Sequence, residues 1–314
     1  MMLILLKIPP MERGNGSLVT EFILLGLSSD TKIQIVLFHV FLILYVATIM
    51  GNALLIAAVR MDSRLHSSMY YFLANLSFMD ICYSSVIVPR MLRDFLSALK
   101  RISLNECLVQ HIFYLFLGET ECILLAFMAF DRYVAICNPL RYNMVMSTRS
   151  CARMIAVAWL TGLAISSSDI SFAVKLKYCG SNIIDDFFCE ATALIQLTCS
   201  DVSEHNVAII VSFIVVLLIP LLLILFSYLK IILSIVKMGY KSSKSFSTCL
   251  AHLIVVVLFY GSAIYTYTRP RESKPDSTNK FMSVFYTLLT PMVNPLIYSL
   301  KNKDVQNAKL RPRT

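Results

Sequence analysis

Asp131, Arg132 and Tyr133 place an acid, a base and a phenol in consecutive positions at the end of a long apolar stretch, 107–130. A charged pair cannot lie deep in lipid, so this run marks the point where a hydrophobic helix meets water. Charges at such a boundary suit a docking site, or an ion pair that changes partners when helices move. The sequence therefore predicts a switch at the membrane surface.

Three further acids, Asp80, Glu119 and Glu121, lie in the middle of apolar stretches. An ionised carboxylate at the bilayer centre costs roughly 2.5 to 3.5 kcal/mol even on the more lenient scale, so each acid must face protein or water. Arg132 follows Glu121 by about three helical turns, roughly 16 Å, which puts both residues on one helix face. Glu119 is rotated by about 200° from Glu121, so it faces neighbouring helices or the side of an internal cavity.

These groups need a scaffold inside a membrane, and the composition predicts one. The 314 residues are 57% hydrophobic and 15% charged, which is too apolar for a soluble protein of this length. Apolar stretches, most of them long enough to cross a bilayer as helices, recur seven times along the chain. They run over 33–59, 65–89, 107–130, 154–168, 205–229, 245–268 and 281–300.

The stretches are continuously apolar, whereas the strands of a membrane barrel would alternate polar and apolar residues. The predicted fold class is an all-α membrane protein, a seven-transmembrane helix bundle in one domain. The fourth stretch is the weakest, because its far end, from Ser166 to Asp169, is polar. We expect an extracellular segment over 1–32, the bundle over 33–300 and a short cytoplasmic tail over 301–314.

A feature of the amino-terminal segment indicates the orientation of the bundle in the membrane better than the distribution of charge does. Lys and Arg residues divide almost evenly between the two sides, so the positive-inside rule gives only a weak signal. Asn15-Gly16-Ser17 fits a glycosylation acceptor, which would require this end to be extracellular. The apolar patch before Lys7 is too short for a signal peptide, so the first span is expected to act as an uncleaved signal anchor.

Nine cysteines are present, and Cys107, Cys179, Cys189 and Cys199 fall on the outer side in this topology. An oxidising compartment permits disulfides there, but four cysteines allow three pairings and spacing alone does not choose one. The other cysteines are expected to be free, buried thiols. They are Cys82, Cys122, Cys137, Cys151 and Cys249.

Three runs carry a family resemblance: MAFDRYVAICNPLRY from Met128, KSFSTCLAH from Lys244 and PMVNPLIYSLKNKDV from Pro291. Together they resemble the motifs of olfactory receptors, a branch of the rhodopsin-like (class A) G-protein-coupled receptors. The likeness covers about Met11 to Val305. It implies a plasma-membrane receptor that binds a small volatile odorant and activates a stimulatory, olfactory-type heterotrimeric G protein. It also implies no cofactor, and the disulfides Cys107–Cys189 and Cys179–Cys199.

The resemblance assigns switch residues at the cytosolic side. Asp131 would hold Arg132 at rest and release it to the G protein when spans move. The acid that completes this lock in other class A receptors is missing from the start of the sixth span, so Tyr228, His252 and Tyr298 are the candidates for other resting contacts. The full set implied is Asp131, Arg132, Tyr133, Tyr228, His252, Asn294, Pro295 and Tyr298. Pro295 lies within a predicted helix, removes a backbone hydrogen bond and permits a kink.

Four polar positions match a buried cluster of the family. They are Asn52, Asp80, Glu121 and Asn294. In related receptors such a cluster holds a sodium ion or a proton that disfavours the active state. The alternative is a structural hydrogen-bond network that binds no ion.

A seven-helix bundle offers one natural ligand cavity, between the third, fifth, sixth and seventh spans and above this buried cluster. Its implied lining is mostly apolar with a few hydroxyls. It comprises Tyr114, Leu115, Gly118, Ser212, Val216, Tyr260, Ala263, Tyr267 and Thr287. Glu119 is unusual for the family and would attract a cationic or hydrogen-bonding odorant. The alternative is a protonated Glu119 bonded to a neighbouring helix.

Two departures from the family pattern change local expectations. Ser68 stands where the family usually has proline, so the first cytosolic turn is expected to be looser. Asp186 replaces a frequent histidine three residues before Cys189, which argues against a metal site there.

The competing class of function is a multi-span transporter or channel that uses the intramembrane carboxylates. No inverted repeat is visible in the sequence, which disfavours it. An enzyme is not expected, because no HExxH or GxSxG run is present.

Membrane lipids are expected partners and nucleic acid is not. Basic inner loops suit a G protein or anionic headgroups. These loops carry Arg141, Arg149, Lys237, Lys241, Lys244 and Lys301.

Overall fold

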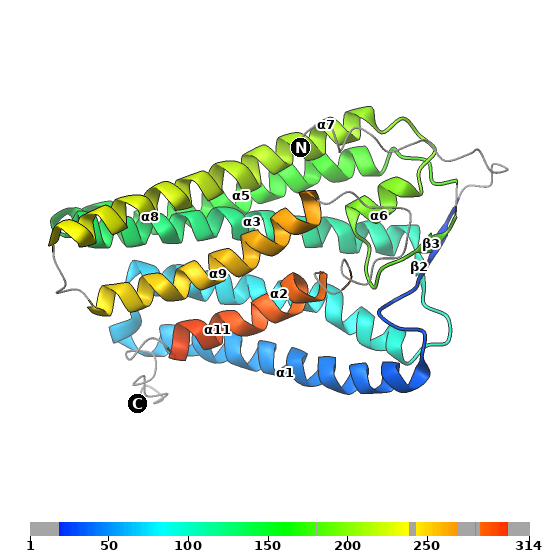
Figure 1. Cartoon of the computed structure of the whole chain (residues 1–314), viewed down its shortest axis with the longest axis horizontal. Helices are drawn as coiled ribbons and strands as arrows, with labels where there is room; N and C mark the ends of the chain where they lie inside the picture. The colour runs from blue at the N-terminus through cyan, green and yellow to red at the C-terminus, as the bar shows by residue number, and fades with distance from the viewer. Residues whose placement is uncertain (1–18, 180, 239–242, 269–279, 281–282, 301–314) are drawn as a thin grey trace.

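The computed structural model describes residues 19–179, 181–238, 243–268, 280 and 283–300. Long helices run side by side across this part of the chain (Figure 1). They are α1 (Thr31–Met61), α2 (Ser68–Phe95), α3 (Leu104–Cys137), α5 (Thr148–Ala173), α7 (Ser203–Ser212), α8 (Ile219–Met238), α9 (Ser243–Thr268) and α11 (Thr290–Leu300). The π-helix η3 (Phe213–Leu218) joins α7 to α8 in one rod, and the π-helix η4 (Phe285–Leu289) runs into α11.

The predicted seven-helix bundle is confirmed by these rods. Five described helices are long and apolar enough to cross a membrane, and two shorter apolar helices, Cys249–Tyr265 and Thr287–Ile297, complete the set. The fourth predicted stretch, the weakest in sequence, lies within α5, which continues through Ser166 to Ala173. It remains helical there because Ser166 and Asp169 are buried against neighbouring helices rather than exposed to lipid.

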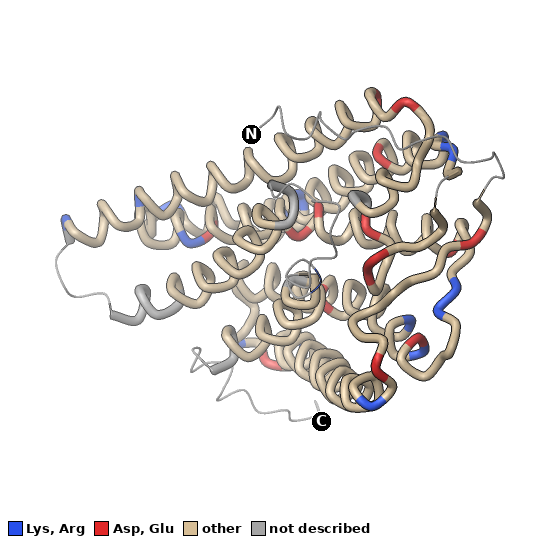
Figure 2. Tube along the Cα trace, turned by 45° about the vertical axis from the view of Figure 1, so that its right-hand side comes forward, with Lys and Arg blue, Asp and Glu red and all other residues tan. Residues whose placement is uncertain are grey.

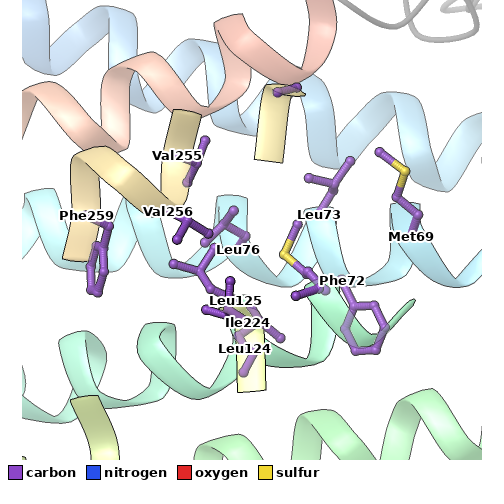
Figure 3. Packing of buried hydrophobic residues seen from close by; sticks show 14 of the residues in the cluster. Met69, Phe72, Leu73, Leu76, Leu124, Leu125, Ile224, Val255, Val256 and Phe259 are labelled. Atoms are coloured by element: carbon purple, nitrogen blue, oxygen red, sulfur yellow. The ribbon is translucent and has the colours of Figure 1, made fainter. Parts of the chain in front are cut away.

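The hydrophobic core joins α2, α3, α8 and α9 in the half of the bundle that contains Arg132. Figure 3 shows side chains from these four helices meeting one another. The labelled residues are Met69, Phe72, Leu73, Leu76, Leu124, Leu125, Ile224, Val255, Val256 and Phe259. By contrast, α1 and α8 leave many large apolar side chains exposed, as expected of helices that face lipid tails.

The opposite end of the bundle carries a three-stranded sheet that was not predicted from the sequence (Figure 1). β1 (Glu21–Leu24) pairs antiparallel with β2 (Arg101–Ser103) and parallel with β3 (Ile183–Ile184). Phe22 and Leu24 point into a small buried cluster beneath it. We call this side of the molecule the sheet end and the other side the Arg132 end.

Short elements complete the two ends. At the Arg132 end, η1 (Ser63–Leu65) links α1 to α2, and η2 (Pro139–Arg141) with α4 (Tyr142–Val145) links α3 to α5. At the sheet end, α6 (Ala191–Gln196) lies in the long loop after α5.

Two disulfides fasten the loop that contains α6. Cys107 near the start of α3 is bonded to Cys189, and Cys179 is bonded to Cys199. These are the pairs that the family resemblance implied. The other five cysteines are free, with Cys122, Cys151 and Cys249 buried.

Candidate functional site

Charged positions divide between the ends and the interior of the bundle. Lys and Arg lie mostly near the helix ends, whereas acids also occur along the length of the bundle (Figure 2). Asp80, Glu119 and Glu121 are all at least nine-tenths buried, as sequence reasoning required of acids within spans. Three polar groupings follow from the contacts of the buried acids.

The first grouping, the Asp131 cluster, comprises Ser68, Asp131, Arg132 and Tyr142 at the Arg132 end. The Asp131 carboxylate is 1% exposed and accepts hydrogen bonds from Arg132 Nε at 3.1 Å and Nη2 at 2.5 Å. Its other oxygen accepts from Ser68 Oγ at 2.7 Å and from the Tyr142 hydroxyl at 2.9 Å. Three side chains thus fix one carboxylate at the membrane boundary.

A looser turn was expected at Ser68, but in the structure its side chain is hydrogen-bonded to another helix. Its hydroxyl donates to Asp131, which also accepts from the Tyr142 hydroxyl, so the start of α2 is linked to the end of α3 and, through Asp131, to the loop after it. Burial, reinforced by the charge of Asp131, raises the pKa of Tyr142 to about 12. Tyr142 therefore remains a hydrogen-bond donor at physiological pH.

Tyr228 of α8 and His252 of α9 meet in the same half of the bundle. The Tyr228 hydroxyl lies 2.8 Å from His252 Nδ1 and 3.3 Å from the Cys249 carbonyl oxygen, to which it donates. The two rings stack with centroids 5.8 Å apart. Tyr133 packs on Phe130. The side chain of Tyr298, the third candidate for a resting contact, lies outside the described residues.

The second grouping is the core polar cluster of Asn52, Asp80, Glu121 and Asn294, each at most 2% exposed. Asn294 Nδ2 donates to both Asp80 oxygens at 3.1 Å. Asn52 Nδ2 donates to the Pro291 carbonyl oxygen at 3.0 Å, and the charge of Glu121 acts on Asp80. The structure thus brings together these four polar residues from α1, α2, α3 and α11.

Two acceptors of the core polar cluster, Asn52 Oδ1 and Glu121 Oε1, are buried without a hydrogen-bond partner. Carboxylate and amide oxygens are the ligands that hard cations prefer, so this donor set fits a sodium ion. Pro295, next to Asn294, lies against Gly51: a Cβ added to Gly51 would be 3.4 Å from Pro295 Cγ. The close approach of α1 and α11 at this point positions Asn52 beside Asn294.

The residues predicted to line a ligand cavity do not all face the same part of the bundle. Tyr114 packs against Tyr83 and Phe188, and Gly118 also faces Tyr83, so both lie toward α2. Tyr260 is buried in α9 and donates to the Cys122 carbonyl oxygen of α3 at 2.8 Å.

The other lining candidates differ in burial. Val216 is buried in η3 and Thr287 in η4. Leu115 and Ala263 are half-buried. The side chain of Tyr267 lies outside the described residues.

The third grouping, the acid-pair site, comprises Glu119, Asp169 and Ser212 at the junction of α3, α5 and α7. Glu119 faces α5, as its rotation away from Glu121 predicted, and it contacts the backbone of Ser166. Ser212 Oγ donates to both oxygens of Asp169, at 2.8 and 3.0 Å. Sequence reasoning missed Asp169, although an acid at the polar end of an apolar stretch was a usable signal.

Comparisons with known proteins give matches over most of the chain. A family model described as "Olfactory receptor" matches residues 41–311. Human olfactory receptor 2D2 is 49% identical over 300 residues, covering 95% of this chain and 97% of that protein. Human olfactory receptor 13C2 is 45% identical over 306 residues, covering 95% and 96%.

A solved structure supports the fold alone. The crystal structure of squid rhodopsin matches with a TM-score of 0.72 at 19% identity, covering 90% of this chain and 80% of that chain. The arrangement of helices is therefore similar to that of squid rhodopsin.

Proposed function

Since the chain belongs to the olfactory receptor family, we propose that it is an odorant-activated receptor of the plasma membrane that acts through a stimulatory G protein. Members of this family are multi-pass G-protein-coupled receptors, so the chain is a signalling receptor and not an enzyme. We further propose that the amino terminus and the sheet end face outside the cell. The Arg132 end then faces the cytosol and the G protein.

The Asp131 cluster is the observation that supports signalling best. It holds the Arg132 guanidinium in an ion pair at one end of the bundle, far from the disulfide-braced sheet end. An ion pair of this kind is a switch only if a second state releases the arginine. A ligand produces that release when it binds the released state more tightly than the resting one.

We propose that the Tyr228–His252 contact is the resting contact that replaces the missing lock between Arg132 and the sixth span. It joins α8 to α9 directly beside the core packed around Val255 and Val256. Outward movement of α9 would break this contact and open the Arg132 end to a G protein. Pro295, next to Asn294, permits a kink in α11, so α11 could change its bend when α9 moves.

The ligand is proposed to occupy the bundle near Tyr260, Val216 and Thr287. These side chains are buried in α9, η3 and η4, and the two π-helical turns are a kind of local irregularity that is frequent at functional sites. Apolar walls with a few hydroxyls bind small volatile molecules through dispersion and one or two hydrogen bonds.

We propose that the core polar cluster binds sodium in the resting state, through its two carboxylates and the free Asn52 oxygen. Replacing sodium by choline in the buffer should then increase basal signalling of the wild type and leave Glu121→Gln unchanged. Equal basal signalling of the wild type in both buffers would favour a structural network that binds no ion.

The experiment that tests the receptor function measures nucleotide exchange on a stimulatory G protein in membranes containing the chain, with a library of volatile compounds. At least one compound should stimulate exchange, and Arg132→Ala should abolish that response without lowering surface expression. A compound-dependent flux of ions or solutes without exchange would instead favour the transporter or channel.

A further inference from the structure

The acid-pair site is a second buried pair of carboxylates, separate from Asp80 and Glu121 of the core polar cluster. Glu119 is 8% exposed and Asp169 is 5% exposed. None of the ion pairs among the described residues involves either acid. Two carboxylates in a medium of low dielectric repel each other strongly, so they require protons or a cation between them.

Helix packing explains why these two acids lie near each other. Gly162, Ser166 and Asp169 recur at helical spacing and lie on the buried face of α5. At Gly162 the backbones of α5 and α3 are so close that an added Cβ would be 2.3 Å from Thr120 Oγ1. Because side chains lean toward the amino end of their helix, Glu119 reaches from α3 toward Ser166 and Asp169.

Some oxygen atoms at the acid-pair site can accept further hydrogen bonds. Glu119 Oε2 is buried and has no hydrogen-bond partner, although Asp169 is close enough for its charge to act on Glu119. The Ser212 hydroxyl already bonds Asp169 and retains lone pairs that can accept. Two carboxylates from α3 and α5 thus lie near each other, and a hydroxyl from α7 contacts one of them.

The chemistry of these acceptors identifies one class of ligand. A primary ammonium group carries three N–H donors and a positive charge, which matches two carboxylates and a hydroxyl. A neutral alcohol offers one donor and no charge.

We propose that the acid-pair site binds the ammonium group of a small primary amine. The proposal rests on the receptor function above and names the class of ligand. The apolar part of the amine would extend toward η3, which begins directly after Ser212 and contains the buried Val216. The site selects against molecules that leave both carboxylates without a counter-charge.

The test compares linear and cyclic primary amines with alcohols of the same carbon skeleton, in cells that report cyclic AMP. The wild type should respond to at least one amine at a concentration at which the matched alcohol is weaker. Glu119→Gln and Asp169→Asn should raise the half-maximal concentration for that amine by about tenfold to a hundredfold, because each removes a charge-assisted hydrogen bond. Responses to neutral odorants should change by less than about threefold.

Glu204→Gln is the matched control, because it removes an exposed acid on the same helix as Ser212. It should leave the amine response unchanged. Glu119→Asp, which keeps the charge, should recover part of the response.

Separate outcomes identify which proposal has failed. A wild type that responds to neutral odorants and to no amine overturns the amine site and leaves the receptor function standing. Equal losses of amine and neutral responses in Glu119→Gln also overturn it, since they indicate a structural pair that shares a proton. If neither variant reaches the cell surface, the wild-type comparison of amine and alcohol decides alone.

Discussion

Among single residues of the Asp131 cluster, Ser68 is expected to stabilise the resting state. Its hydroxyl is one of two neutral donors to Asp131, so Ser68→Ala leaves a buried carboxylate oxygen with one donor fewer. The loss should cost about 1 to 3 kcal/mol in the resting state and raise basal cyclic AMP signalling. Measurement of ligand-free cyclic AMP, normalised to surface expression, checks this expectation.

Ser67→Ala provides the matched control for Ser68→Ala. Ser67 is the exposed N-cap residue of α2 and makes no side-chain capping bond, so its removal should leave basal signalling unchanged. Tyr142→Phe should act in the same direction as Ser68→Ala. If basal signalling stays at the wild-type value in both variants, the two hydroxyls do not stabilise the resting state.

The direction in which a buried side chain faces was predictable from sequence, but its partner was not. Helical rotation alone placed Glu119 away from Glu121, and the structure agrees. The same rule is silent on which helix lies opposite, so Asp169 and Ser212 were not linked to Glu119. The looser turn expected at Ser68 was wrong for the same reason, because the serine hydroxyl donates to Asp131 of another helix.

At the scale of helices, the contact between α3 and α5 depends on Gly162. Gly162→Ala would place a Cβ 2.3 Å from Thr120 Oγ1 and 3.1 Å from the Thr120 nitrogen. Overpacking of this kind typically costs about 1 to 3 kcal/mol, so the Tm of the purified receptor and its surface expression should fall. Gly261→Ala in α9 is the control, since an added Cβ there meets nothing within 4 Å. Equal Tm values for the two variants would contradict the close helix contact.

Long apolar helices were readily predicted, whereas the irregular elements were not. A run of apolar residues specifies a span in lipid, and each of the seven predicted stretches corresponds to a helical rod. The π-helices η3 and η4 widen a turn without any distinct residue pattern. The strands β1 to β3 are at most four residues long and pair across distant parts of the chain, which local sequence does not encode.

The proposed topology of the chain predicts which acceptor triplet carries a glycan. Asn15-Gly16-Ser17 and Asn75-Leu76-Ser77 both fit the acceptor pattern. Asn75 lies within α2 and its side-chain nitrogen donates to the Tyr71 carbonyl oxygen, whereas Asn15 lies outside the described residues. Asn15→Gln should therefore abolish the mobility shift caused by glycosidase, and Asn75→Gln should leave it intact. A glycosidase shift that persists in Asn15→Gln would argue against glycosylation at this residue.

The two ends of the bundle should be coupled through the contact between α8 and α9. His252→Phe keeps a ring stacked on Tyr228 and removes the 2.8 Å hydrogen bond. Loss of a hydrogen bond worth about 1 kcal/mol from the resting state favours the active state about fivefold. Because ligand and G protein act on the same equilibrium, basal signalling should rise and the half-maximal ligand concentration should fall together.

Tyr45→Phe separates this coupling from a general loosening of the bundle. It removes a hydroxyl contact of 3.0 Å between Tyr45 of α1 and Ser85 of α2, away from the α8–α9 contact. Basal signalling and ligand sensitivity should remain at wild-type values in Tyr45→Phe and change together in His252→Phe. If both variants behave alike, any lost contact between helices activates the receptor. If only basal signalling rises in His252→Phe, the Tyr228–His252 contact is not linked to the ligand site.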